Sequence, residues 1–131
     1  MLFLLGCKQN ATEPTQELTV QTDKVLYAPN ETIAILLCNS TRSTAFFGHC
    51  AYRLGFYIEK KVNSTWVEKS SVAIVCLAIY PIGVRAVESR MSNGDTIVIG
   101  EAGTYRLRFP FGWQLSNTWA DSLFSKQFTV Q

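Results

Sequence analysis

Hydrophobic and polar positions alternate most strictly near the end of the chain, directly after a turn that closes at Gly103. Within Thr104–Phe109 the apolar face holds Tyr105, Leu107 and Phe109. The polar face holds Thr104, Arg106 and Arg108. Side chains alternate across a β-strand, so this pattern predicts a strand with one buried and one solvated face. A tyrosine at the start of such a strand is typical of a tyrosine corner. We therefore expect the ring of Tyr105 in the core and its hydroxyl on a backbone group of the bend.

Segments with the same kind of pattern follow one another along the rest of the chain. Alternating, β-branched or aromatic positions predict strands at 17–21, 25–27, 32–38, 53–60, 65–69, 96–99 and 124–130. The reversal at 62–64 predicts that the strands on either side of it form a hairpin. The apolar run 72–80 fits a buried strand and a covered loop equally well, because periodicity does not separate the two.

Turn-forming residues separate these segments. The segment Phe46–Cys50 is predicted to cross between strands, Ser92–Asp95 to form a turn, and Pro110 to end the strand that starts at Thr104. A long connection then runs from residue 111 to residue 123. No window has a helical period. Seven or eight short strands at this spacing predict an all-β sandwich or barrel.

Composition and charge narrow the picture further. The chain has 131 residues, of which 47% are apolar and 17% charged, as expected for one ordered globular domain. Its formal net charge of +2 gives little electrostatic attraction for nucleic acid, and no run of Lys and Arg provides a local one. We expect a monomer without a nucleic-acid partner.

The first residues resemble a processing signal. Leu4-Leu5-Gly6-Cys7 is similar to a bacterial lipobox, in which cleavage precedes the cysteine and its thiol is lipidated. The polar stretch 8–16 has the composition of a flexible tether. The apolar run is shorter than the usual ~7–15 residues and has no basic residue before it, so the start codon lies upstream of Met1 or the run is a chance apolar terminus. On the first alternative, residues 1–16 are a truncated lipoprotein signal and tether, and residues 17–131 are the folded domain.

Most of residues 18–130 resembles the bacterial immunoglobulin-like (Ig-like) domains of small lipoproteins. The resemblance lies in Tyr27, Pro29, Asn30, Glu31, Asn39-Ser40, Cys50, Trp66, Cys76, Asn93-Gly94-Asp95, Gly103-Thr104-Tyr105-Arg106-Leu107 and Phe128-Thr129-Val130. It implies an Ig-like antiparallel β-sandwich of seven to eight strands at the cell envelope, anchored by lipid to the outer or plasma membrane. The chain departs from antibody domains because Leu107 stands where the second inter-sheet cysteine would be.

The resemblance also bears on the cysteines. Its members often carry one cysteine before the central hairpin and one after it, which fits Cys50 and Cys76 on either side of Trp66. A disulfide between them would contribute about 3–4 kcal/mol on the chain-entropy model. The alternatives are two separate buried thiols, or a Cys38–Cys50 pair; with a Cys50–Cys76 bond, Cys38 would be a small buried residue at a strand end.

Candidate binding residues are aromatic. In an Ig-like sandwich the segments that hold Phe46 and Phe47, and Trp113 and Trp119, would meet at one end. Exposed together, these rings would suit peptide or glycan binding through apolar area and stacking. The alternative is that they cap the core beneath long loops. Arg106 and Arg108 could form a basic stripe with Lys126 opposite, although an ordinary solvated sheet face has the same pattern.

Nothing in the sequence points to catalysis. The chain has a single histidine, His49, no nucleophile-elbow motif and no Cys-x-x-Cys, so we expect no catalytic residue, metal or cofactor. The predicted function is a non-catalytic envelope module for binding or structural interaction, with a protein or glycan partner. The alternative is a proteinase inhibitor that presents the loop 111–123 to a protease.

Overall fold

The structure is a computed structural model that describes residues 17–50, 53–72, 84–87, 92–114 and 119–131. Within these ranges the side chains of residues 49, 50, 84–87 and 92–94 are not described. Residues 1–16 and the apolar run 73–83 lie outside the described part, as do the predictions made for them.

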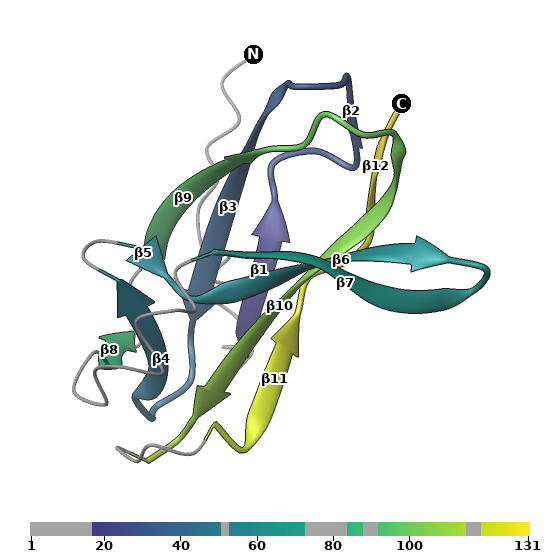
Figure 1. The fold of residues 1–131 in the computed structure, drawn as a ribbon. Coiled ribbons are helices and arrows are strands. Elements are labelled where there is room, and N and C mark those ends of the chain that lie inside the picture. The colour runs from purple at the N-terminus through teal and green to yellow at the C-terminus, as the bar shows by residue number, and fades with distance from the viewer. Residues whose placement is uncertain (1–16, 51–52, 73–83, 88–91, 115–118) are drawn as a thin grey trace.

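Every regular element in the described part of the chain is a β-strand (Figure 1). The strands are β1 (Leu18–Thr22), β2 (Leu26–Tyr27), β3 (Thr32–Asn39), β4 (Ala45–Cys50), β5 (Arg53–Leu54), β6 (Phe56–Val62), β7 (Thr65–Val72), β8 (Val84–Val87), β9 (Ser92–Val98), β10 (Gly103–Gly112), β11 (Asp121–Phe124) and β12 (Phe128–Val130). The described ranges hold no helix that is long and apolar enough to cross a membrane. The prediction of an all-β fold is confirmed.

The strands form two sheets. The smaller sheet has the order β1-β3-β9 and is antiparallel throughout. The larger sheet is built on β10, which pairs with β12 and β11 along one side and with β6 and β4 along the other. β7 pairs with β6, β5 and β8 pair with β4, and β2 pairs with β12 in parallel. This parallel pair departs from the wholly antiparallel arrangement that was expected.

Side chains from both sheets meet in one core, which gives the fold its sandwich-like form. The smaller sheet contributes Ile33, Ile35 and Leu37, all from alternate positions of β3. The larger sheet contributes alternate residues of β10, among them Leu107 and the other residues of the apolar face predicted from the sequence. The alternation therefore places one face of each central strand in the core.

The tyrosine corner predicted at Tyr105 is present. The ring is 1% exposed and stacks on Phe128, with 6.0 Å between the ring centroids. Its hydroxyl donates a 2.7 Å hydrogen bond to the backbone carbonyl of Glu101, four residues earlier in the bend that precedes β10. The bond fixes the entry of β10 into the sheet.

We expect Tyr105→Phe to lower the free energy of unfolding by about 1 kcal/mol, because it removes one hydrogen bond and keeps the ring. Urea denaturation would measure the loss as a shift in the midpoint. Tyr57→Phe is the matched control, since Tyr57 lies on the outer face of β6 and its hydroxyl bonds no described residue. Equal shifts in the two variants would contradict the role assigned to the Tyr105 hydroxyl.

A second tyrosine ties β2 to the smaller sheet. The Tyr27 hydroxyl donates to Asp23 Oδ1 at 2.6 Å and accepts from the Lys24 backbone N–H at 2.7 Å. The same Asp23 oxygen accepts the Ala34 N–H of β3 at 3.0 Å. Burial, reinforced by the hydrogen bond to Asp23, raises the pKa of Tyr27 to about 12.

This pKa predicts a loss of stability in alkali. The pKa of an unfolded tyrosine is about 10, so the contribution of Tyr27 is complete below pH 10 and is lost as the pH rises toward 12. The ion pair with Glu31 raises the pKa of Lys24 and adds a loss of the same sign. The free energy of unfolding, measured with urea at several pH values between 9 and 12, should therefore fall more steeply with pH for the wild type than for Tyr27→Phe. The same dependence on pH in both proteins would contradict this assignment.

Several strand boundaries differ from those predicted. Residues 45–50 form β4 and do not simply cross between strands, because they pair with β10 and β8. Asn93-Gly94-Asp95 lies inside β9 and forms no turn, because all seven residues of β9 have partners in β3. Pairing with a neighbouring strand thus outweighs local turn propensity.

β10 also continues through Pro110, where the sequence predicted an end. On one side of β10, β6 pairs with residues 105–108 and β4 with residues 111–112, so neither strand pairs with Pro110. On the other side, Ser125 N–H donates to Leu107 C=O, so the backbone groups of Leu107 point toward β11. Successive residues of a strand point their backbone groups to opposite sides, so those of Pro110, three residues later, point away from β11. A missing N–H costs little at such a position.

The C-terminal segment is two strands where one was predicted. β11 ends at Phe124 and β12 begins at Phe128, and these two rings lie in different places. Phe128 is in the core, whereas Phe124 is 43% exposed and faces outward. In one continuous strand Phe124 and Phe128 would share a face. They do not, because the register against β10 shifts by one residue between β11 and β12, so that Phe124 lies opposite the outward-facing Arg108 and Phe128 opposite the buried Tyr105.

Candidate functional site

The four candidate aromatic residues do not form one cluster. Phe47 is fully buried in β4 and stacks on Phe111, with centroids 5.6 Å apart. Its inclusion among exposed binding residues is corrected: it is a core residue. Phe46, its neighbour in β4, pairs with Gly112 and lies on the opposite face of the sheet, where it is half-buried.

Trp113 is the exposed member of the set. It directly follows β10, is 41% exposed, and packs edge-on against Phe111 at 5.4 Å between centroids. Trp119 is half-buried and lies two residues before β11. The long connection predicted for 111–123 is shorter than expected, because its two ends belong to β10 and β11.

The outer face of the larger sheet carries an arginine held between two rings. The Arg106 guanidinium lies 4.5 Å from the centroid of Trp66 and 4.2 Å from that of Phe124. Its Nε donates to Glu59 at 2.6 Å. Stacking and the hydrogen bond together hold the guanidinium in one position across β7, β10 and β11.

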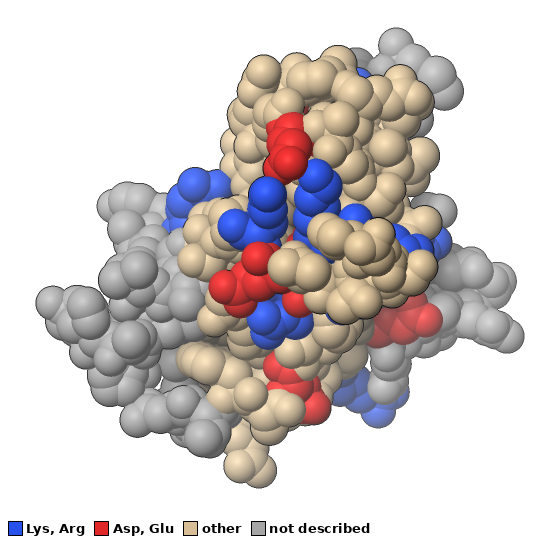
Figure 2. All heavy atoms as spheres, turned by 45° about the vertical axis from the view of Figure 1, so that its right-hand side comes forward, with Lys and Arg blue, Asp and Glu red and all other residues tan. Residues whose placement is uncertain are grey.

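Arg108, two residues further along β10 on the same face, has a similar arrangement. Its guanidinium lies 4.2 Å from the Tyr57 centroid, and its Nε donates to the second oxygen of Glu59 at 3.0 Å. Glu68 lies 3.7 Å from another nitrogen of Arg108. The two arginines are thus neutralised by carboxylates of β6 and β7. In Figure 2, basic and acidic side chains are interleaved on the face that includes the β6–β7 hairpin.

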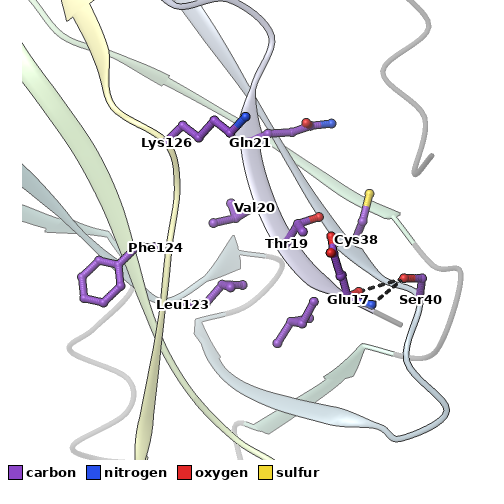
Figure 3. Close-up of a pocket in the computed structure, with 10 residues that line it drawn as sticks. Glu17, Thr19, Val20, Gln21, Cys38, Ser40, Leu123, Phe124 and Lys126 are labelled. Atoms are coloured by element: carbon purple, nitrogen blue, oxygen red, sulfur yellow. Dashed lines mark hydrogen bonds between the residues drawn. The ribbon is translucent and has the colours of Figure 1, made fainter. Parts of the chain in front are cut away.

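A groove lies where the edges of the two sheets approach each other. It has a volume of about 400 Å³. It is lined by residues of β1 and its flank, by Cys38 and Ser40 at the end of β3, and by Leu123, Phe124 and Lys126. Leu18, Val20 and Leu123 supply its apolar lining. Figure 3 shows Lys126 beside Gln21 at one end and Glu17 at the other. We call it the β1–β11 groove; the sequence patterns gave no signal for it, because it depends on which strands become neighbours.

The cysteines are described only in part. Cys38 is buried near the end of β3 and is disulfide-bonded, so it is not the unpaired residue that the preferred pairing left over. The side chains of Cys50 and Cys76 lie outside the described residues, and their pairing stays a prediction. The chain has four cysteines, so a Cys50–Cys76 bond is compatible with a bonded Cys38 only if Cys38 bonds Cys7, which would then carry no lipid.

Two further predictions concern His49 and a metal site. His49 lies in β4, with its side chain outside the described part. Within the described residues, no group of three or more His, Cys, Asp and Glu is placed to hold a metal ion.

Comparisons with known proteins give no family. No family model matches the chain, and no curated protein matches it. Among solved structures, a superoxide reductase (neelaredoxin) from Ignicoccus hospitalis matches with a TM-score of 0.43 and 8% identity, over 86% of this chain and 80% of that one. The Pseudomonas fluorescens alkylpurine DNA glycosylase AlkC, bound to DNA containing an abasic site analog, matches with a TM-score of 0.41 and 7% identity, over 89% of this chain and 31% of that one. Likenesses this weak support neither a fold family nor an activity.

Proposed function

We propose that the chain is a non-catalytic binding module with an Ig-like β-sandwich, held at a bacterial cell envelope by a lipid on Cys7. A lipid on Cys7 requires that Cys38 bonds Cys50 or Cys76, in place of the predicted Cys50–Cys76 pair. The family is supported by the tyrosine corner at Tyr105 and by two sheets that share one core. The compartment is supported by the lipobox-like sequence before Cys7 and by the polar stretch after it. A protein or a glycan is the proposed partner.

One observation carries the binding role: the exposed ring of Trp113 at the end of β10. Contact with the buried Phe111 fixes the position of the indole, so little side-chain freedom is lost when a partner covers it. Tryptophan supplies a large apolar area and a polar N–H, and is enriched among residues that dominate binding energy. Trp113 is therefore the proposed anchor.

The proposal is tested by presenting the immobilised protein to a glycan array and to purified envelope proteins. Trp113→Ala should weaken binding at least tenfold, about 1.4 kcal/mol, as expected for an anchor residue. Val67→Ala is the control, because Val67 is also exposed, at 45%, but lies on the β6–β7 hairpin. Equal binding by the wild type and Trp113→Ala would refute the role of this residue.

The same variants separate this function from protease inhibition. An inhibitor would slow a protease in a one-to-one ratio and present the connection between β10 and β11 to the enzyme cleft. A panel of purified proteases with intact and Trp113→Ala protein would reveal such activity. Stoichiometric inhibition would replace the binding-module proposal.

A further inference from the structure

We propose a second binding site, beyond the role given to Trp113: the β1–β11 groove accepts an extended peptide segment of another protein. The segment would add to the free edge of β1 as an antiparallel strand. Such strand addition gains affinity from main-chain hydrogen bonds and selectivity from alternate side chains. The site lies between the two sheets and uses neither Trp113 nor Phe46.

Among the residues that the structure describes, β1 has a partner strand along one edge and none along the other. Ser40 N–H donates to Glu17 C=O, and Asp23 N–H donates to Ala34 C=O, so the odd-numbered residues of this segment face β3. The backbone groups of Leu18, Val20 and Thr22 therefore point away from β3. β1 has no other partner strand among the described residues. Leu18 and Val20 line the groove, so their outward backbone groups lie along it.

The other edge of the smaller sheet is covered in part. β9 is its other outer strand, and Arg53 reaches across from β5 to cover it. Arg53 Nε lies 3.1 Å from one oxygen of Asp95, and its Nη2 donates to the backbone carbonyl of Thr96 at 2.7 Å. Proteins commonly protect sheet edges against unwanted pairing in this way. No such side chain bonds the outward backbone of β1 in the described part of the chain.

The groove also has the dimensions and chemistry of a strand site. Five residues of β1 line or flank it, a length of about 17 Å, which matches five or six residues of extended peptide. Leu18, Val20 and Leu123 would contact the alternate side chains that point inward. Leu123 is itself partly buried against the core, so the groove opens onto the side of the sandwich.

Charges at the two ends give the peptide a direction. Lys126 lies beside Gln21, near the end of β1, and Glu17 lies just before its start (Figure 3). A strand antiparallel to β1 has its N-terminal end near Lys126 and its C-terminal end near Glu17. The complementary ligand is acidic at its first residue, small and aliphatic at alternate central residues, and basic at its last residue.

The probe is the synthetic peptide Ac-Glu-Val-Thr-Val-Thr-Lys-amide, titrated into the isotope-labelled full chain and followed by NMR. The amide signals of Leu18, Val20 and Thr22 should shift with saturation, whereas that of Thr96, whose carbonyl accepts a hydrogen bond from Arg53 at the edge of β9, should not. Two further peptides carry N-methyl groups at alternate residues, in the two possible frames. One frame should weaken binding at least tenfold, because it removes the donors that face β1.

A charge exchange tests the direction. Lys126→Glu should weaken the peptide about threefold to fivefold, as expected for an exposed ion pair, and a peptide that begins with lysine should recover that loss. Lys61→Glu makes the same charge change on the β6–β7 hairpin and should leave binding unchanged. Lys126 is exposed, so its replacement should not disturb folding.

Three results would overturn the proposal. The first is the absence of saturable shifts at millimolar peptide. The second is equal binding of both N-methylated peptides, which would exclude pairing with the β1 backbone. The third is a dimer in sedimentation experiments that the peptide does not dissociate, because the edge would then be covered by a second copy of the chain. None of these three measurements depends on Trp113, so the groove proposal and the Trp113 proposal can fail separately.

Discussion

Replacing Phe47 by alanine is expected to lower the free energy of unfolding by about 3–5 kcal/mol. The ring is fully buried and contacts Phe111 and Phe109, at 5.6 Å and 6.4 Å between centroids, so its removal leaves a cavity between β4 and β10. Urea denaturation should show a lower midpoint with an unchanged slope. A loss of this size is a large fraction of the stability of a domain of this length.

Phe46→Ala is the matched control for this variant. Phe46 is the preceding residue, is half-buried, and points to the other face of the sheet. Its replacement should cost about 1 kcal/mol or less, as is usual for a partly exposed side chain. If Phe46→Ala proved the more damaging change, the assignment of the two faces of β4 would be reversed.

Removing the carboxylate of Glu59 is expected to have the next largest effect, about 2–3 kcal/mol for Glu59→Ala. Glu59 is 8% exposed and accepts hydrogen bonds from Arg106 and Arg108, one on each oxygen. Without it, two guanidinium groups on the same face of β10 face each other with no shared counter-charge. The arginine side chains remain 25% exposed, which places the loss below that of a fully buried ion pair.

Glu68→Ala provides the comparison. Glu68 is 55% exposed and approaches Arg108 at 3.7 Å, so its removal should cost less than 1 kcal/mol. A double-mutant cycle that combines Glu59→Ala with Arg106→Leu should give a coupling free energy of about 1–2 kcal/mol. A coupling near zero would mean that the rings of Trp66 and Phe124, and not the carboxylate, hold Arg106.

The features that follow from local alternation were predicted well. Tyr105 and Leu107 reach the core because a strand turns every second side chain the same way, whatever its neighbours are. The reversal at Asn63-Ser64 was predicted from turn chemistry, and both residues have positive φ, 50° and 66°. The β6–β7 hairpin that it joins needs only residues close in sequence.

The features that depend on distant neighbours were not predicted. Asn93 and Gly94 have turn propensity. They belong to β9 because β3 is long enough to pair with both of them. Pro110 was expected to end its strand. It does not, because neither β6 nor β4 pairs with it, and the residues around Pro110 carry no information about where those two strands pair. The exposure of Trp113 and the burial of Phe47 likewise follow from the partners of β10 and β4, not from their own sequence.

The same reason explains the β1–β11 groove. The residues that line it are ordinary in composition, and what distinguishes them is that β1 has a partner on one side while Arg53 covers the opposite outer strand. Which edge of a sheet stays free is a property of the whole topology. A sequence pattern describes one strand at a time and carries no such information.

The position of β12 has a consequence for the order in which the domain folds. Val130 pairs with Tyr27, which lies about a hundred residues earlier, and β12 joins β2 to β10. Closing so long a loop costs entropy before any contact compensates for it, so the ladder that joins these three strands is expected to form late. Refolding should accordingly take milliseconds to seconds, and substitutions in β12 should act on the rate of unfolding more than on the rate of folding.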